Sequence, residues 1–530
     1  MNASRLRRAW DAPVVVHALA LAALLVVLAG VMGTGTSFSE DEGAAVVQAR
    51  QLADHHTWVV RPPLPRVDPA VALYPYRLPD VGTKGAAPFA KHPLYALALA
   101  GLWRLGGING LVGLSIAGTV AAAVAGWYVA RLIDASLARA AFWAVGVASP
   151  LLFDGFLVQA HAVGAALAGG LALLLFGERR AWASALGGGA VAAVLVGLRT
   201  EGVLFVVAAG VIALVFRRSR WGGAGALVGG ALALGLTQVW TRHILGAPRS
   251  GATYASGAST QRTGFSGRIE GALTTLFHPS YSAGRRANAL LFAALVAFAV
   301  AAVLWRRRSS SAGVVAAIGA VAVVLRVALG PTQVVPGLFV ACPLLWAGLW
   351  LGAAQSRGAS QRALLLVVGA FAFAVIATQY SQGGGIEWGG RYFALGLPLV
   401  MPLAVGALRV APRPMLVALS VASLALAVLA IGALRSTHQR TERVLDAIDV
   451  HSDLVVTTAG LLPRLDWPHY EQRRWVIVAP DKLDDLLRSL PGAGVHRVAL
   501  VFPDVLPPDG WARRGTPVRG LPWRVAVVRT

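Results

Sequence analysis

Three consecutive acids follow the first apolar run of the chain. Glu40, Asp41 and Glu42 come directly after Ser39. A carboxylate at the edge of a membrane could remove a proton from an attacking hydroxyl or amine. Ser39 and Glu42 also fit a capping box, in which both side chains serve only to start a helix. The sequence therefore offers Asp41 as a catalytic base, with Glu42 and Glu40 as the alternatives.

A lysine closes the polar stretch that these acids open. Lys91 and His92 precede Pro93, a residue that suits the first turn of a helix. A lysine ammonium could hold a lipid phosphate. A lysine at this place could also be a simple interfacial anchor. We predict Lys91 as a phosphate-binding residue and His92 as a substrate contact.

The elements that must position these residues are membrane helices. Hydrophobic residues make up 56% of the 530 residues, charged residues only 13%, and the net charge is +23. Apolar runs of span length recur from residue 13 to residue 434. Short arginine clusters between them follow the positive-inside pattern, so the charge indicates cytoplasmic loops and not nucleic acid. A soluble enzyme and a disordered chain are excluded, and a multi-pass protein of the cell inner (plasma) membrane is predicted.

The predicted organisation is a polytopic α-helical part with a small C-terminal domain. Residues 1–435 form the membrane part, with about thirteen transmembrane helices and an uncleaved first span. Residues 34–91 form a first outer loop, in which 44–54 is an amphipathic helix at the membrane surface. Residues 246–287 form a second outer loop. The tail, 436–530, holds eleven of the 24 acids and is predicted as an extracytoplasmic α/β domain.

The tail alternates strand-like and helix-like segments. Strands are predicted at 453–458, 475–479, 498–502 and 523–528, and a helix is predicted at 481–490. The single cysteine, Cys342, allows no internal disulfide. No phosphate-binding loop, catalytic triad or metal-ligand spacing is present in the tail sequence.

Further polar residues interrupt the apolar runs. The candidate substrate or phosphate contacts among them are Asp154, His161, Arg199, Glu201, Arg391, Tyr392 and, in the second outer loop, His278 and Arg285. Each also has a simpler role: a helix cap, a packed histidine, a pair across a turn or an interfacial anchor. The second outer loop could be a solvated connection or a lid over a lipid-linked sugar.

The combination resembles the GT-C superfamily of membrane glycosyltransferases, in particular its lipid A aminoarabinose transferases and protein O-mannosyltransferases. Asp41 and Glu42 match the family's catalytic acid pair, and Lys91 matches the lysine of its Lys-Pro-Pro-Leu-type segment. His92 stands where the family has the first proline. Weaker similarities lie in segments 149–154 with His161, 197–202 and 389–392. The resemblance covers most of residues 1–410, and the tail matches no branch.

The resemblance implies transfer of a sugar from a polyprenyl-phosphate donor to an acceptor outside the cytoplasm, with inversion at the anomeric carbon. Asp41 would be the base, and Lys91 and Arg391 would stabilise the departing phosphate. A divalent cation helps some members of the superfamily, and the three acids permit one here, but no His, Cys or Asp spacing demands it. The acceptor could be a cell-envelope glycan, a lipid or a protein.

Three alternatives remain. A lipid-linked glycan polymerase or ligase would rely on arginines in a late outer loop instead of an acidic base. A lipid-sugar carrier would need ionisable groups near the membrane centre. Only six acids lie between Lys91 and Arg435, nearly all at predicted span ends, which disfavours a proton-coupled carrier. A scaffold whose tail binds a partner would make the acid and lysine pattern a coincidence.

Overall fold

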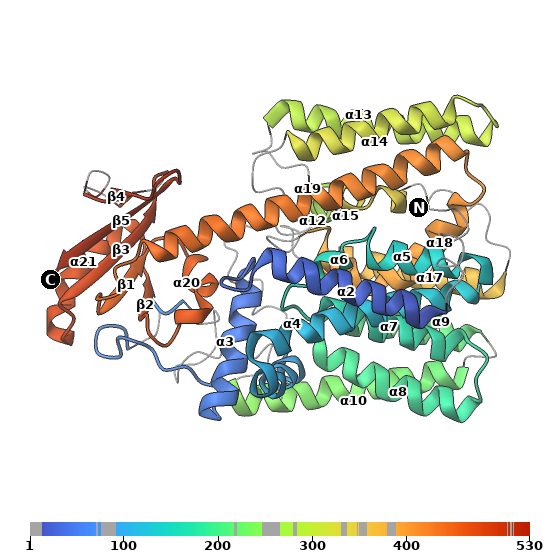
Figure 1. Cartoon of the computed structure of the whole chain (residues 1–530). Helices are drawn as coiled ribbons and strands as arrows, with labels where there is room; N and C mark the ends of the chain where they lie inside the picture. The colour runs from blue at the N-terminus through green and yellow to red at the C-terminus, as the bar shows by residue number, and fades with distance from the viewer. Residues whose placement is uncertain are drawn as a thin grey trace. The chain divides into compact units, whose positions relative to one another are not determined.

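Helices dominate the computed structural model of the chain (Figure 1). The structure describes residues 13–69, 73–75, 92–216, 220–245, 265–278, 284–329, 337–346, 348, 358–378, 388–505, 507–508, 511 and 514–530. The helices up to residue 245 are α2 (Val14–Met32), α3 (Glu40–His55), α4 (Pro93–Arg131), η1 (Ala135–Leu137), α5 (Ala138–Gly146), α6 (Leu151–Asp154), α7 (His161–Phe176), α8 (Ala181–Leu198), α9 (Glu201–Val215) and α10 (Arg220–Leu245). Those that follow, before the tail, are α12 (Phe265–Phe277), α13 (Gly284–Arg306), α14 (Ala312–Ala328), α15 (Leu338–Ala341), α17 (Ala359–Thr378), η3 (Arg391–Gly396), α18 (Leu397–Leu408) and α19 (Arg413–Asp446).

The chain is a multi-pass membrane protein. Eight helical segments of the described residues are long and apolar enough to cross a membrane. Three shorter apolar helices, α7, α9 and α14, have 16, 15 and 17 residues. The count of thirteen spans stays a prediction, because parts of several predicted runs lie outside the described residues.

One predicted apolar run is divided in the structure, and one predicted break between two runs is present. The run at 138–153 is two helices, α5 and α6, and the prediction of one continuous span there is wrong. In α4, by contrast, Gly106 and Gly107 leave helical geometry. Gly107 has a φ of +56°, which a residue without a Cβ adopts at little cost. The predicted break between 93–107 and 109–130 is therefore confirmed.

Contacts group the chain into two compact units that differ from the predicted ranges 1–435 and 436–530. The first unit comprises Met1–Ala29, Val112–Thr237 and Ala258–Ala433. The second comprises Gly30–Leu111, Gln238–Gly257 and Leu434–Thr530. The predicted first outer loop thus shares a unit with the tail.

Helices of the first unit approach one another through small residues. A Cβ on Gly229 of α10 would lie 2.1 Å from the carbonyl oxygen of Gly189 in α8. A Cβ on Gly169 of α7 would lie 2.6 Å from that of Ala125 in α4. Small side chains let helix backbones pack closely where the surroundings are apolar.

The second unit contains a five-stranded mixed sheet in the order β2-β1-β3-β5-β4. The strands are β1 (Leu454–Thr457), β2 (Trp475–Ile477), β3 (Arg497–Pro503), β4 (Thr516–Pro517) and β5 (Trp523–Arg529). β1 pairs in parallel with β2 and β3, and β5 pairs antiparallel with β3 and β4. All four predicted strands are confirmed, and β4 is the one not predicted.

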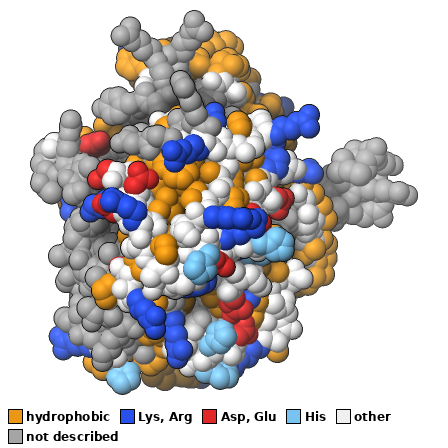
Figure 2. Space-filling model, turned by 90° about the vertical axis from the view of Figure 1, so that its left-hand side faces the viewer, with side chains coloured by type: hydrophobic (Ala, Val, Ile, Leu, Met, Phe, Trp, Pro, Cys, Tyr) orange, Lys and Arg blue, Asp and Glu red, His pale blue; other side chains and the backbone are white. Residues whose placement is uncertain are grey.

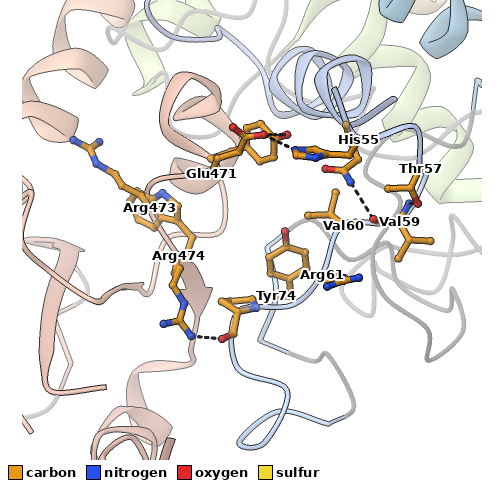
Figure 3. A pocket seen from close by; sticks show the side chains of 13 residues that line it. His55, Thr57, Val59, Val60, Arg61, Tyr74, Glu471, Arg473 and Arg474 are labelled. Carbon is orange, nitrogen blue, oxygen red and sulfur yellow. Dashed lines mark hydrogen bonds and ion pairs between the residues drawn. The ribbon is translucent and has the colours of Figure 1, made fainter. Parts of the chain in front are cut away.

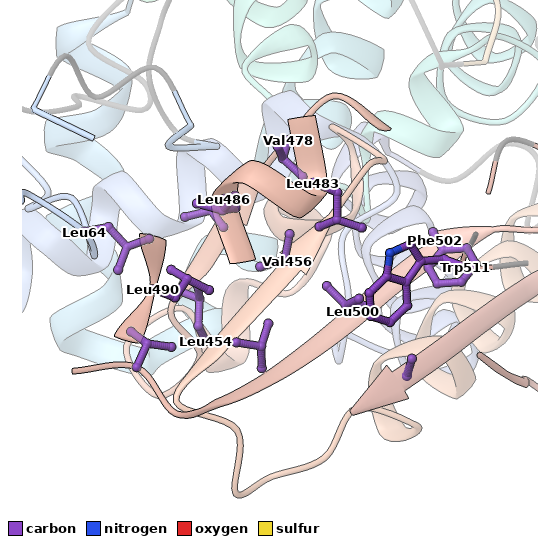
Figure 4. Packing of buried hydrophobic residues seen from close by; sticks show 14 residues of the cluster. Leu64, Leu454, Val456, Val478, Leu483, Leu486, Leu490, Leu500, Phe502 and Trp511 are labelled. Carbon is purple, nitrogen blue, oxygen red and sulfur yellow. The ribbon is translucent and has the colours of Figure 1, made fainter. Parts of the chain in front are cut away.

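Short helices accompany the sheet. They are α20 (Leu462–Leu465), η4 (Trp467–His469), η5 (Pro480–Lys482), α21 (Leu483–Ser489) and η6 (Pro491–Ala493). The predicted helix at 481–490 corresponds to η5 and α21. Leu483 and Leu486 of α21 pack into the hydrophobic core beside the sheet (Figure 4).

Residues of the predicted first outer loop complete this core. Leu64 is 2% exposed and packs among the buried side chains of the tail (Figure 4). The amide of Ile477 in β2 donates to the carbonyl of Leu73, at 2.8 Å. The sheet therefore does not close its core with tail residues alone.

Candidate functional site

The three acids lie on the first turn of α3. Ser39 is the N-cap, and its Oγ accepts from the amide of Glu42 at 3.3 Å. The Glu42 Oε2 in return accepts from the amide of Phe38 at 2.7 Å. Glu42 is 5% exposed. The predicted cap by Ser39 is present, and the return hydrogen bond of Glu42 goes to the residue before the N-cap and not to the N-cap amide of the standard capping box.

Glu40 contacts the tail. Its Oε2 lies 2.6 Å from Nη1 of Arg464, whose Nε donates to the carbonyl of Pro75 at 2.8 Å. Asp41, between these two acids, is half-buried. Glu40 and Glu42 are each held in a structural contact, and the choice of Asp41 as the reacting carboxylate stays a prediction.

The start of α3 packs directly on the backbone of α20. A Cβ on Gly43 would lie 1.7 Å from the carbonyl oxygen of Arg464. The amide of Ser37 donates to the carbonyl of Leu465 at 3.4 Å. Only a glycine at position 43 permits this approach, so the acid turn is positioned by the tail.

Arg50 connects the second half of α3 to the tail. Its Nη1 donates to the carbonyls of Trp467 and Pro468, at 3.1 and 3.2 Å. Its guanidinium also lies over the rings of Trp103 and Tyr470, at 5.3 and 4.7 Å from their centroids. A planar cation suits both kinds of contact at once.

Glu471 completes this connection. Its carboxylate accepts from His55 Nε2 at 2.9 Å and from the Tyr470 hydroxyl at 2.8 Å, and it lies 3.4 Å from Arg50. Burial opposes ionisation of Glu471 most strongly. The hydrogen bonds from His55 and Tyr470 and the charge of Arg50 outweigh burial and hold the pKa of this carboxyl below its usual range.

The predicted surface helix is instead a packed helix. It begins at Glu40 and not at residue 44, and its expected polar face is partly buried. Gln48 and Gln51 are 0% and 8% exposed, and they donate to the carbonyls of Trp58 and Val59. Their side-chain amides explain the burial, because each satisfies a carbonyl of the following loop.

Four predicted residues form two buried ionic contacts in the first unit. Nδ1 of His161, at the first residue of α7, lies 3.5 Å from Oδ1 of Asp154. Nη2 of Arg199 lies 2.9 Å from Oε1 of Glu201. All four residues are at most 8% exposed. Paired burial is the arrangement that charged groups require away from water.

Arg391 joins the same cluster. It follows Gly389 and Gly390, whose φ angles of +80° and +69° favour glycine. Its guanidinium lies 5.2 Å from the ring centroid of Tyr392. Arg391 begins η3, which packs against α7 and α9, the helices that begin with His161 and Glu201. Residues from three predicted segments, 149–161, 197–202 and 389–392, are therefore brought together. We call the four buried residues Asp154, His161, Arg199 and Glu201, with the half-buried Arg391, the buried ionic cluster.

The other predicted contacts have different surroundings. His92 is 5% exposed, and its carbonyl accepts from the amide of Ala96 in the first turn of α4. His278 has a φ of +43°, and its carbonyl accepts from Arg326 of α14. Arg285 lies in α13, but its side chain is not among those described, and Lys91 lies outside the described residues.

Sequence reasoning missed Arg50, Arg464, Glu471 and Arg326. The first three make contacts between segments more than 400 positions apart, for which no local pattern exists. Arg326 could have been found, because an arginine within an apolar run is a sequence signal of a functional site. In the structure it is 4% exposed. Among the residues that the structure describes, no three His, Cys, Asp or Glu side chains are grouped to hold a metal ion.

No family model matches the chain, and no curated protein is detectably similar to it in sequence. Two solved structures of ArnT from Cupriavidus metallidurans are similar, one bound to undecaprenyl phosphate and one in the apo state. Each has 13% sequence identity and a TM-score of 0.42, and the alignment covers 96% of this chain and 97% of that chain.

Proposed function

We propose that this protein is a membrane glycosyltransferase that transfers a sugar from a polyprenyl-phosphate donor to an acceptor outside the cytoplasm. The observation that carries the proposal is the buried ionic cluster, which collects residues of three segments that the sequence resemblance singled out. Ionisable groups buried among apolar helices are costly, so they usually mark a functional site.

The cluster supports binding of a lipid phosphate. Arg199 is paired with Glu201 and Asp154 with His161, and Arg391 adds a second guanidinium. A guanidinium can hold the phosphate of a lipid head group through two parallel hydrogen bonds. The proposal therefore assigns Arg391 to the donor phosphate, and the sequence resemblance alone adds Lys91.

The acid turn of α3 supplies the base in this proposal. Asp41 removes the proton of the acceptor hydroxyl or amine as that atom bonds to the anomeric carbon. The bond from the anomeric carbon to the phosphate oxygen breaks at the same time, and polyprenyl phosphate leaves. Single displacement inverts the anomeric configuration and forms no covalent sugar–enzyme intermediate.

Transfer assays on paired variants test the proposal. The purified full chain is incubated with radiolabelled polyprenyl-phosphate sugars and a membrane extract as acceptor. Asp41→Asn should abolish transfer, whereas Glu40→Gln, in the same turn, should retain most of it. Arg391→Ala should weaken donor binding, measured with undecaprenyl phosphate.

Two results would contradict the assignment. Full transfer by the Asp41→Asn variant would show that another residue is the base. If the protein transports a lipid-linked sugar across liposome membranes and consumes no donor, it is a carrier and not a glycosyltransferase.

A further inference from the structure

A pocket of about 910 Å³ lies beside the end of α3 opposite to the acid turn. Gln51 and His55 of α3 form one wall (Figure 3). The first outer loop forms a second wall, and residues 470–475 of the tail form a third. All of these segments belong to the second compact unit. None of the residues predicted from the sequence as site residues lines this pocket.

The pocket has an excess of positive charge. Three arginines, Arg61, Arg473 and Arg474, line it together with one carboxylate, Glu471. Glu471 is already bound by Arg50 and His55. The lining therefore has more guanidinium groups than carboxylates, so an anion that enters the pocket can bind to a guanidinium.

Two of the three arginines have charge available for a ligand. Arg473 is bound to the fully buried carboxylate of Asp466, at 3.1 Å. Among the described residues, Arg474 donates to a neutral group, the carbonyl of Pro63. Arg61 is exposed and has no ion pair within the described part of the chain. Both exposed guanidinium groups can thus bind a carboxylate or a phosphate.

This charge is local. On the face of the molecule in Figure 2, basic side chains are interspersed with acidic and histidine side chains, and the described surface in that view shows no single continuous basic patch. The described part of this face therefore does not indicate a broad polyanion-binding surface. A concave site with a few converging polar groups is the usual form of a site for a smaller ligand.

Two tyrosines give the pocket aromatic walls. Tyr74 is 8% exposed, and Tyr470 is half-buried beside Glu471. Burial raises the pKa of both hydroxyls above their usual range, so the rings stay neutral. Figure 3 shows Tyr74 beside Arg61, between Val60 and Arg474. An aromatic face next to guanidinium donors suits a sugar ring that carries an acidic group.

We propose that this pocket binds an anionic saccharide, and that this saccharide is a part of the acceptor remote from the reacting group. The second statement rests on the proposed function, whereas the first does not. Gln51 and His55 lie ten and fourteen residues after Asp41 on α3, which corresponds to about 15–20 Å along the helix. The pocket therefore selects the acceptor and takes no part in proton transfer.

Binding measurements on the full chain in detergent test the site directly. The probes are tetragalacturonate, a phosphorylated maltotetraose, neutral maltotetraose and inorganic phosphate. At least one anionic saccharide should bind more tightly than maltotetraose and phosphate. Arg61→Ala should weaken that binding about tenfold, as loss of one charged hydrogen-bonding partner predicts. Arg61→Lys should weaken it less.

Arg529→Ala is the matched control, because Arg529 is an exposed arginine on β5 that does not line the pocket. It should leave binding unchanged, and both alanine variants should unfold at the wild-type temperature. The site is refuted if neither anionic saccharide binds, if Arg61→Ala and Arg529→Ala behave alike, or if neutral maltotetraose binds equally well. Equal binding of phosphate alone would reduce the pocket to a simple anion site.

Acceptor kinetics separate this inference from the proposed function. Where transfer is observed, Arg61→Ala should raise the KM for an anionic acceptor about tenfold and leave kcat unchanged. Transfer with an unchanged KM would refute the acceptor role and keep the enzyme. Absence of transfer with intact saccharide binding would refute the enzyme and keep the pocket.

Discussion

Two arginine–carboxylate pairs in this molecule have the same chemistry and different surroundings. Arg199 and Glu201 are two residues apart, and their side chains are only 7% and 4% exposed. Arg464 and Glu40 are 424 positions apart, and their side chains are 20% and 38% exposed. The distances, 2.9 and 2.6 Å, do not distinguish the pairs. Their exposed fractions do distinguish them. The buried pair should therefore contribute to the stability of the fold, whereas the exposed pair should mainly position the acid turn.

The largest expected effect comes from breaking the buried pair on one side. Arg199→Met leaves the Glu201 carboxylate buried without its cation, which should cost about 3–5 kcal/mol of the free energy of unfolding. The measurement is unfolding of the purified protein by a denaturing detergent. The double variant Arg199→Met with Glu201→Met should recover much of the loss. A single variant as stable as wild type would show that water reaches Glu201.

Packing at Gly43 should have the next largest effect. Gly43→Ala places a Cβ against the Arg464 carbonyl, and overpacking of this kind typically costs about 1–3 kcal/mol. The control is Gly113→Ala in α4, where no atom lies within 4 Å of the added Cβ. That control should be neutral or slightly stabilising. Thermal unfolding of both variants checks the difference, and equal behaviour would mean that α3 is not packed on α20.

Breaking the exposed pair should have a smaller effect on stability. Arg464→Ala removes the partner of Glu40, and half-exposed ion pairs contribute about 0–1 kcal/mol. The same denaturing-detergent titration measures this change. A loss of stability as large as that of Arg199→Met would show that burial does not separate the two pairs in their contribution to stability.

The smallest effect concerns pH. Because the folded pKa of Glu471 is below its ordinary value of 4.5, its ionised form stabilises the folded state above that value. This contribution should be lost as the pH falls through the lower, folded pKa. Glu471→Gln should lack it at pH 7 and show a shallower loss of thermal stability on acidification. Asp481→Asn, at an exposed carboxyl of the same tail, is the control. Identical acid profiles for all three proteins would contradict the prediction.

Local patterns in the sequence predicted much of this molecule. Ser39 and Glu42 indicated a capping box because that motif needs only four adjacent residues. The four predicted strands were found because alternation and β-branched residues are also local signals. Arg199 and Glu201 were predicted to pair across a turn for the same reason.

Long-range contacts could not be predicted in this way. Arg50 and Arg464 look like ordinary polar residues until the tail is folded against the first outer loop. Gly43 gave no sign of its contact, because a glycine within a helix has many uses. The pocket beside Arg61 is assembled from three segments, and its charge balance depends on which arginines already have a carboxylate partner.

The contact between the acid turn and the tail has a consequence for biosynthesis. Chains are made from the N-terminus, and the acid turn is complete before Arg464 has been translated. Until the tail has been synthesised, Glu40 and Gly43 lack the surface against which they pack. A prematurely terminated chain would therefore carry all three acids in a helix start with nothing to position it. Full-length synthesis is in this way a condition for an ordered acid turn.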